Sequence, residues 1–343
     1  MVEKIHDAPA IYRTRIPLPN NPLKELNSYV LPDADRPLII DTGFNRPECL
    51  SALLDGLHEL SVDLTKTDLF LTHLHGDHTG LAVKLAERGC TIFMNPDDHN
   101  YFESMRSGIA VEYLDELFIN EGFPKAEVDQ QGTQNQARLY MTESSYDIIP
   151  VEDGVMPILA GHTFTAITTP GHTPGHTCLY LPGKELMFLG DHVLFDITPN
   201  ITVWKGVDDS LGNYLDSLKR IAAFPAHLAL PGHRGNQMDF LTRIEQIQNH
   251  HQQRLNETLQ IIAAEPKLTA YEITARMTWS MRGKTWREFP VGQKWFATGE
   301  SLAHLHYLLK RGLIIRDTHD GHGIYVINYG ASGGVVPYVH KGI

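Results

Sequence analysis

The segment THLHGDHTG, residues 72–80, constrains the fold more than any other part of the chain. Its four candidate metal ligands, His73, His75, Asp77 and His78, lie within six residues. In extended backbone, side chains two residues apart project to the same side, so His73 and His75 can bind one metal ion. Asp77 and His78 turn at the start of a predicted helix, where they can face a second ion. Imidazole nitrogen and carboxylate oxygen together suit Zn²⁺, with Fe or Mn as alternatives.

Three later segments repeat one arrangement, in which a predicted strand ends at a ligand residue beside glycine. They read TPGHTPGH (169–176), LMFLGD (186–191) and LPGHRG (230–235). Their candidate ligands are His172, Asp191 and His233. Because small residues let the backbone approach an ion closely, these strand ends can converge at one edge of a sheet sandwich.

The order of predicted elements indicates two domains. A strand–helix–strand pattern and a second β-rich half predict a catalytic domain over residues 1–236, interrupted by a polar and aromatic insertion at 96–141. We interpret this insertion as a lid, an oligomer contact in a homodimer, or a plain surface excursion. Residues 237–343 predict a long amphipathic helix (238–264), shorter helices and a β-hairpin. That outline is typical of a winged-helix module.

The motif HLHGDH resembles the HxHxDH signature of the metallo-β-lactamase superfamily, and the later segments resemble its remaining metal motifs in the same order. The resemblance covers residues 27–235 and implies an α+β fold, a four-layer αββα sandwich with metals at one sheet edge. It also implies a ligand set. The first metal is bound by His73, His75 and His172, the second by Asp77, His78 and His233, and both by Asp191.

The resemblance separates ligands from their neighbours. Only the first histidine of TPGHTPGH matches the family ligand, so His172 is assigned to the first metal, and His176 is expected to orient neighbours. Asp41, which ends LIIDTG, matches a family motif that supports the ligands without binding metal. His192 occupies a position where relatives vary, and it is a candidate for contact with substrate.

The implied mechanism uses two metal ions about 3.5–4 Å apart that share a bridging hydroxide. Asp77 is the predicted catalytic residue, because it would orient that hydroxide while it binds the second metal. The HxExDH variant of oxygen-reducing di-iron relatives is absent, because residue 75 is histidine.

Charge narrows the substrate class. The chain carries a net charge of −12, which argues against nonspecific nucleic-acid binding by the whole molecule. From Lys267 onward, however, ten Lys and Arg face five Asp and Glu. A basic, aromatic loop in this part suits an anionic substrate. Its candidate substrate-binding residues are Arg282, Lys284, Trp286 and Arg287.

The leading hypothesis is a hydrolase of a small anionic thioester or carboxylic ester, similar to the glyoxalase II-like and thioesterase-like branches. An endoribonuclease or phosphodiesterase acting on nucleic acid is the first alternative, and a mono-iron sulfur dioxygenase-like enzyme is the second. The sequence shows no apolar run long enough to cross a membrane and no signal peptide. Its three cysteines, Cys49, Cys90 and Cys178, are scattered. We therefore expect a cytoplasmic protein without disulfides.

Overall fold

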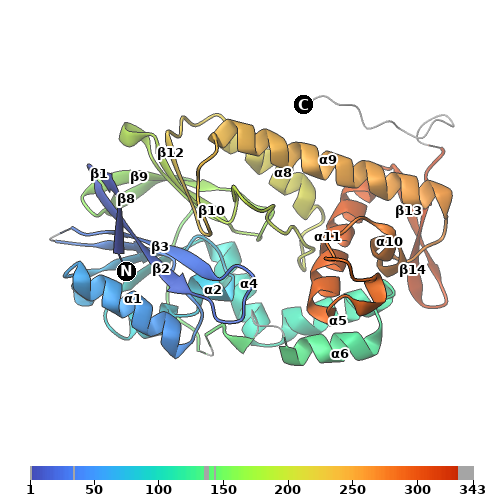
Figure 1. Ribbon diagram of the computed structural model, residues 1–343, viewed down its shortest axis with the longest axis horizontal. Helices are drawn as coiled ribbons and strands as arrows, with labels where there is room; N and C mark the ends of the chain where they lie inside the picture. The colour runs from blue at the N-terminus through green and yellow to red at the C-terminus, as the bar shows by residue number, and fades with distance from the viewer. Residues whose placement is uncertain (1, 34, 135–138, 143, 331–343) are drawn as a thin grey trace. The chain divides into compact units, whose positions relative to one another are not determined.

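The computed structural model describes residues 2–33, 35–134, 139–142 and 144–330 (Figure 1). The chain forms two compact units. The first comprises Met1–Ser107, Gln136–Pro199 and Ser217–Ile244, and the second comprises Gly108–Asn135, Asn200–Asp216 and Glu245–Ile343. Among the described residues, no helix is both long and apolar enough to cross a membrane.

The first unit contains two mixed β-sheets. The seven-stranded sheet has the strands in chain order: β1 (Val2–Asp7), β2 (Ala10–Pro17), β3 (Glu25–Leu31), β4 (Leu38–Ile40), β5 (Asp68–Phe70), β6 (Thr91–Met94) and β7 (Ile149–Pro150). The five-stranded sheet has the order β12 (Leu228–Pro231), β11 (Leu186–Gly190), β10 (Thr177–Leu181), β9 (His162–Thr168) and β8 (Gly154–Leu159).

The two sheets share one hydrophobic core. Tyr29, Ile40 and Phe70 from the larger sheet join Leu179 and Phe188 from the smaller one in a single buried cluster. The rings of Tyr29 and Phe188 lie 5.4 Å apart, so aromatic contact crosses directly between the sheets. This is face-to-face sandwich packing.

Helices cover the outer faces of both sheets. α1 (Pro47–Glu59) packs on β2, where a side chain at Gly56 would meet Thr14 at 2.7 Å. Three further helices belong to this unit: α2 (Gly76–Thr79), α3 (Ala82–Ala86) and α4 (Pro96–Arg106). On the smaller sheet, Arg220 near the end of α8 (Ser210–Ile221) donates to the carbonyl of Thr168. The predicted α+β, αββα architecture is confirmed.

Strand direction brings the functional segments to one edge. β4, β5 and β6 are parallel neighbours, and Asp41 and residues 72–80 follow the carboxyl ends of β4 and β5. β11 and β12 are likewise parallel, and Asp191 and His233 follow their carboxyl ends. Parallel neighbours end at the same sheet edge, so loops far apart in sequence meet there.

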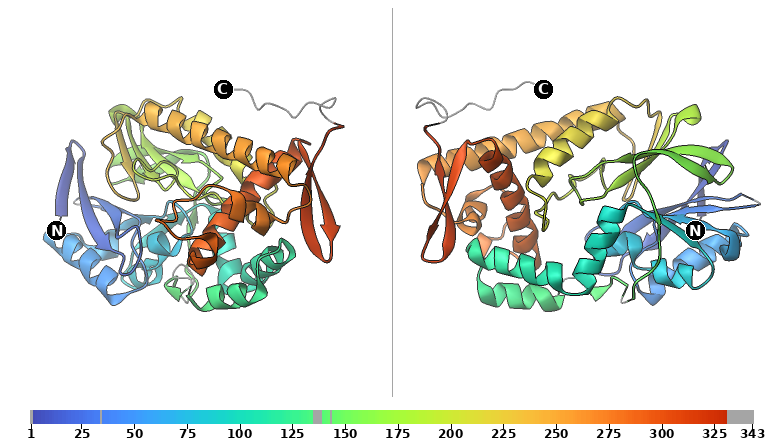
Figure 2. Two further views of the ribbon diagram at one scale, coloured as in Figure 1. Left: turned by 45° about the vertical axis from the view of Figure 1, so that its right-hand side comes forward. Right: turned by 180° about the vertical axis from the view of Figure 1, so that it is seen from behind.

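The second unit is mainly helical (Figure 2). It holds α5 (Ile109–Asn120), α6 (Lys125–Gln134), α10 (Ala270–Arg276), α11 (Val291–Lys310) and the hairpin of β13 (Ile314–His319) and β14 (His322–Ile327), with most of α9 (Phe240–Ala264). The predicted order of helices followed by a hairpin is present. In the first turns of α11, Trp295 is buried by stacking on Phe118 at 3.8 Å.

The predicted insertion at 96–141 is divided between the units. α4 stays in the first unit, whereas α5 and α6 pack with the C-terminal residues, so the predicted single boundary at 236/237 does not describe the two units. A buried carboxylate explains this packing. Glu121 accepts hydrogen bonds of 2.8 Å from Arg316 Nε and from the Tyr325 hydroxyl, both in the hairpin.

We predict that Glu121→Ala destabilises the second unit by about 2–3 kcal/mol, because it leaves Arg316 and the buried Tyr325 hydroxyl without their acceptor. All four tryptophans, Trp204, Trp279, Trp286 and Trp295, lie in this unit, so urea unfolding followed by tryptophan fluorescence reports on it. Glu116→Ala, at an exposed position of α5, the helix that Glu121 follows, is the control. Equal midpoints for the two variants would contradict the prediction.

Candidate metal centre

Seven predicted ligands converge in the first unit. Their donor atoms form three groups, each with all donor atoms within 4.8 Å of one another: His73–His75–His172, His73–His78–Asp191 and Asp77–His78–His233. We name the first of these the first metal group and the last the second metal group; Asp191 lies between them. The ligands converge because the parallel strands end at one sheet edge and because the chain turns at α2, which begins at Gly76 immediately after His75.

The first metal group consists of imidazoles alone. His73 Nε2 lies 3.1 Å from His75 Nδ1, and the ring centroids of His75 and His172 lie 4.6 Å apart. Burial lowers the pKa of His73 well below its usual value and lowers that of His75 to about 3. These imidazoles are therefore neutral at physiological pH, the form whose lone pair binds a metal.

The second metal group mixes imidazole and carboxylate. His233 Nε2 lies 3.4 Å from Asp77 Oδ2 and 3.5 Å from Asp191 Oδ2, while His78 Nε2 lies 3.5 Å from Asp191 Oδ1. Asp191 Oδ2 also lies 3.9 Å from His172 Nε2, so this carboxylate faces both groups. Burial raises the pKa of Asp77, but the nearby imidazoles of His233 and His78 outweigh burial and lower the pKa to about 2.

The donor set fits a divalent metal. Among the described residues, His78 Nε2 and His233 Nε2 are buried and have no hydrogen-bond partner. Buried polar atoms are normally satisfied, so two bare nitrogens beside two carboxylates need an explanation. Nitrogen and oxygen donors in this number are those that Zn²⁺ and similar ions take.

Asp41 supports two ligands, and its hydrogen bonds fix their tautomers. The Nδ1–H of His78 donates to Asp41 Oδ2 at 2.8 Å, so its Nε2 is the atom that faces the cluster. Thr72 Oγ1 donates to the same carboxylate at 2.8 Å and lies 3.0 Å from His73 Nδ1, which orients His73 in the same way. Asp41 has a left-handed backbone, φ 60°, which turns the chain sharply after β4.

His176 lies behind Asp191 and outside the three donor groups. Its Nε2 accepts a hydrogen bond of 3.2 Å from the backbone N–H of Asp191, and its Nδ1 lies 2.8 Å from Thr169 Oγ1. Gly190 permits this contact, because a side chain there would meet His176 Nε2 at 2.7 Å. The structure thus places His176 where it can orient the Asp191 backbone.

Two buried residues outside the predicted site hold the ligand loops. Asn27 on β3 donates through Nδ2 to the carbonyls of Pro231 and Arg234, on either side of His233. Asp98 on α4 accepts from the backbone of Leu74 and from Thr173. Neither residue lies near a ligand in the sequence, so only the capping pattern NPDD at 95–98 offered a local signal.

The predicted substrate-binding residues are not part of the seven-residue cluster. His192 is buried, with its ring 5.6 Å from that of His176, and burial lowers its pKa to about 3. In the second unit Arg282, Lys284 and Arg287 are exposed, whereas Trp286 is half-buried against other aromatic rings. Their contact with substrate stays a prediction.

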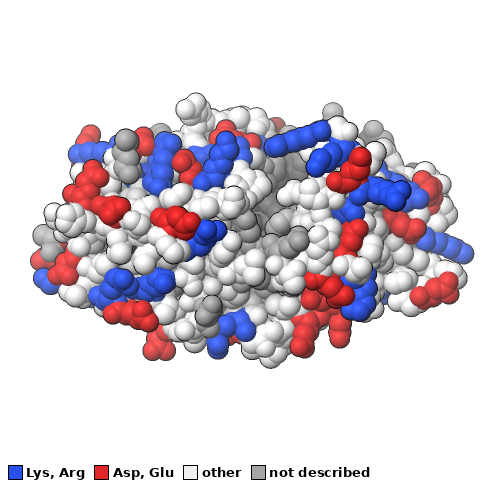
Figure 3. All heavy atoms as spheres, turned by 60° about the horizontal axis from the view of Figure 1, so that its bottom comes forward, with Lys and Arg blue, Asp and Glu red and all other residues white. Residues whose placement is uncertain are grey.

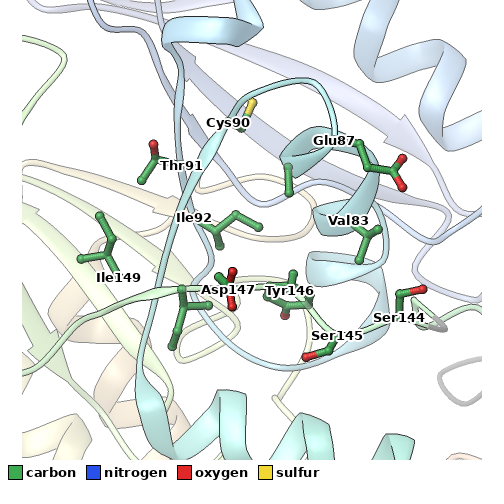
Figure 4. A pocket seen from close by; sticks show the side chains of 12 residues that line it. Val83, Glu87, Cys90, Thr91, Ile92, Ser144, Ser145, Tyr146, Asp147 and Ile149 are labelled. Atoms are coloured by element: carbon green, nitrogen blue, oxygen red, sulfur yellow. The ribbon is translucent and has the colours of Figure 1, made fainter.

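A surface pocket of about 570 Å³ lies elsewhere on the first unit (Figure 4). α3, β6 and residues 144–149 line it, and its carboxylates come from Glu87 and Asp147. None of its lining residues belongs to the seven ligands. The pocket therefore contributes no ligand to the metal centre.

Curated relatives were found for most of the chain. A beta-lactamase-like protein 2 homolog from Caenorhabditis elegans is 26% identical over 290 residues, which cover 82% of this chain and 81% of that protein. Lactamase-like protein nscB from Neosartorya fischeri is 26% identical over 71% of this chain, and the match spans 58% of that relative's length. A protein named atrochrysone carboxyl ACP thioesterase from Emericella nidulans is 26% identical, over 63% of this chain and 53% of that protein.

Solved structures resemble the chain over nearly its whole length. A metallo-beta-lactamase family protein from Thermus thermophilus has a TM-score of 0.78 at 27% identity, over 92% of this chain and 98% of that one. A beta-lactamase domain protein from Burkholderia ambifaria has a TM-score of 0.80 at 25% identity, over 95% of this chain and 94% of that one.

Family models match both parts of the chain. Residues 255–327 match the metallo-beta-lactamase-like C-terminal domain, and residues 24–233, which carry all seven ligands, match the metallo-beta-lactamase superfamily. The chain therefore belongs to the metallo-beta-lactamase superfamily.

Proposed function

We propose that this chain is a metal-dependent hydrolase that holds one divalent ion in the first metal group and a second ion in the second, with Asp191 shared between them. The observation that carries the proposal is the set of bare, buried donors: His78 Nε2 and His233 Nε2 face Asp77 and Asp191 beside three further imidazoles. Zn²⁺ is the first choice of ion, and Fe and Mn are the alternatives.

Bound divalent ions supply Lewis acidity, which polarises a carbonyl and lowers the pKa of water toward neutrality. The residues of the chain would orient the attacking water and hold the metal ligands. Asp77 stays ionised because its pKa is about 2, so it can accept a hydrogen bond from an attacking water but cannot act as an acid at neutral pH. Asp41 and His176 keep the ligands in place through the hydrogen bonds described above.

We further propose that the substrate is a carboxylic thioester. Two relatives carry the printed name atrochrysone carboxyl ACP thioesterase, and the exposed cations Arg282, Lys284 and Arg287 suit an anionic carrier group. A nucleic-acid substrate would favour a continuous basic track. On the face that Figure 3 shows, acidic and basic side chains of the described residues are interspersed instead.

We predict that the purified chain binds two Zn²⁺ ions after removal of metal and reloading. His172→Ala and His233→Ala should each retain about one ion, because each removes a donor from only one group. Elemental analysis after desalting measures the ratio. His227→Ala changes a side chain that is 89% exposed and is the control. A reloaded wild type that holds only one Zn²⁺ per chain would contradict the proposal. One iron per chain in the protein as purified, before metal removal, would favour the sulfur dioxygenase alternative.

We also predict metal-dependent hydrolysis of at least one member of a thioester panel that includes acyl-CoA and acyl-carrier substrates. Asp77→Asn should lower kcat about 100-fold or more, because the neutral amide oxygen accepts a hydrogen bond and binds a metal ion more weakly than the ionised carboxylate does. Asp97→Asn, at an exposed position, should match the wild type. Turnover that survives chelation would refute the metal dependence, and no turnover of any thioester by the reloaded enzyme would refute this substrate class.

A further inference from the structure

We propose that Asp98 is a positioning residue for the first metal group: its buried carboxylate ties the loop of His73 and His75 to the loop of His172. The inference rests on the proposed function, because it concerns the same metal centre. Asp98 itself has no place in the three donor groups. It acts through the backbone and side chains next to the ligands.

The carboxylate accepts three hydrogen bonds from the two loops. Its Oδ2 accepts from the backbone N–H of Leu74 at 2.8 Å and from Thr173 Oγ1 at 2.6 Å. Its Oδ1 accepts from the backbone N–H of Gly175. Leu74 lies between His73 and His75, and Thr173 directly follows His172. Every ligand of the first metal group therefore adjoins a residue that Asp98 holds.

The surroundings of Asp98 stabilise its buried carboxylate and bring the loop of His172 close to it. Asp98 lies in the first turn of α4, where the Asn95 side chain caps the helix and the helix dipole favours a negative charge. The loop of His172 approaches so closely that a side chain at Gly175 would meet Asn95 Oδ1 at 2.5 Å and Asp98 N at 2.7 Å. Asp98 has no exposed surface. A buried carboxylate is costly unless donors surround it, and here three do.

The second metal group has other supports. His78 is oriented by Asp41, and His233 Nδ1 lies 2.8 Å from the backbone carbonyl of Glu25. Neither contact involves Asp98 itself, and Asp41 holds the segment 72–80 from its other side through Thr72. Loss of the Asp98 carboxylate should therefore weaken metal binding by the first group and spare the second. A residue that only stabilised the fold would weaken both groups together.

The test measures Zn²⁺ affinity in two backgrounds by competition with a chromophoric chelator at pH 8. Burial raises the pKa of Asp98 to about 7, so the carboxylate is ionised at this pH. The full-length chain with His233→Ala keeps the first group intact, and the chain with His172→Ala keeps the second. In the first background Asp98→Asn should raise the Kd for Zn²⁺ about 10–100-fold, the usual effect of removing a group that orients metal ligands. In the second background the Kd should change less than about threefold.

Three further variants keep the result interpretable. Asp97→Asn, the exposed neighbour on α4, should leave both Kd values unchanged. Thr173→Val removes one of the three donors and should raise the Kd of the first group by less than Asp98→Asn does, whereas Thr173→Ser keeps the hydroxyl and should retain wild-type affinity.

The outcomes separate this inference from the proposed function. Equal losses in both backgrounds, or an unchanged Kd for the first group in Asp98→Asn, would overturn the role of Asp98 while two bound ions in the wild type would still support the hydrolase. A wild-type chain that binds no Zn²⁺ at either group would overturn both. A loss confined to the first group, graded from Thr173→Val to Asp98→Asn, is the result that we expect.

Discussion

The metal centre depends on imidazole rings whose Nε2 atoms face one another and two carboxylates in a buried cluster. His78 and His73 are oriented through Asp41 and Thr72, and His233 through the carbonyl of Glu25. In each case the ring uses Nδ1 for a partner in the protein, which leaves Nε2 toward the neighbouring donors. Such an arrangement is costly without a ligand, because buried polar atoms lose their hydrogen bonds to water. The hydrogen bonds that orient the ligand rings therefore have to offset this cost.

The sandwich supplies these contacts because its two sheets bring remote segments together. Asn27 and Tyr29 on β3 both donate to the carbonyl of Pro231, more than 200 residues away, just before His233. Gly232 must remain without a side chain, since a Cβ there would meet Asp191 Oδ1 at 2.6 Å. The packing between the sheets thus determines the geometry of the metal centre.

Much of the site could be predicted from sequence, because ligand spacing is local. The order of HLHGDH, His172, Asp191 and His233 at strand ends was sufficient to indicate the cluster. Asp98 and Asn27 could not be assigned a role in this way. Their function arises from hydrogen bonds to residues at least 24 positions away, which leave no periodic pattern in the chain.

The second unit was harder to predict for a related reason. α5 and α6 lie in the middle of the sequence, yet the partners of Glu121 and Glu127 are Arg316 and Lys294 in the C-terminal part. A single domain boundary in the sequence cannot represent a middle segment that packs with the C-terminal part. The substrate hypothesis rests on residues in this unit, such as Arg282 and Lys284, and on the names of relatives.

Anomalous diffraction at the zinc edge, from crystals of the reloaded full-length chain, tests the central claim most directly. The account predicts two peaks per chain in the first unit. One should be bounded by His73, His75 and His172, the other by Asp77, His78 and His233, with Asp191 beside both. A single peak, or peaks away from these seven side chains, would contradict it.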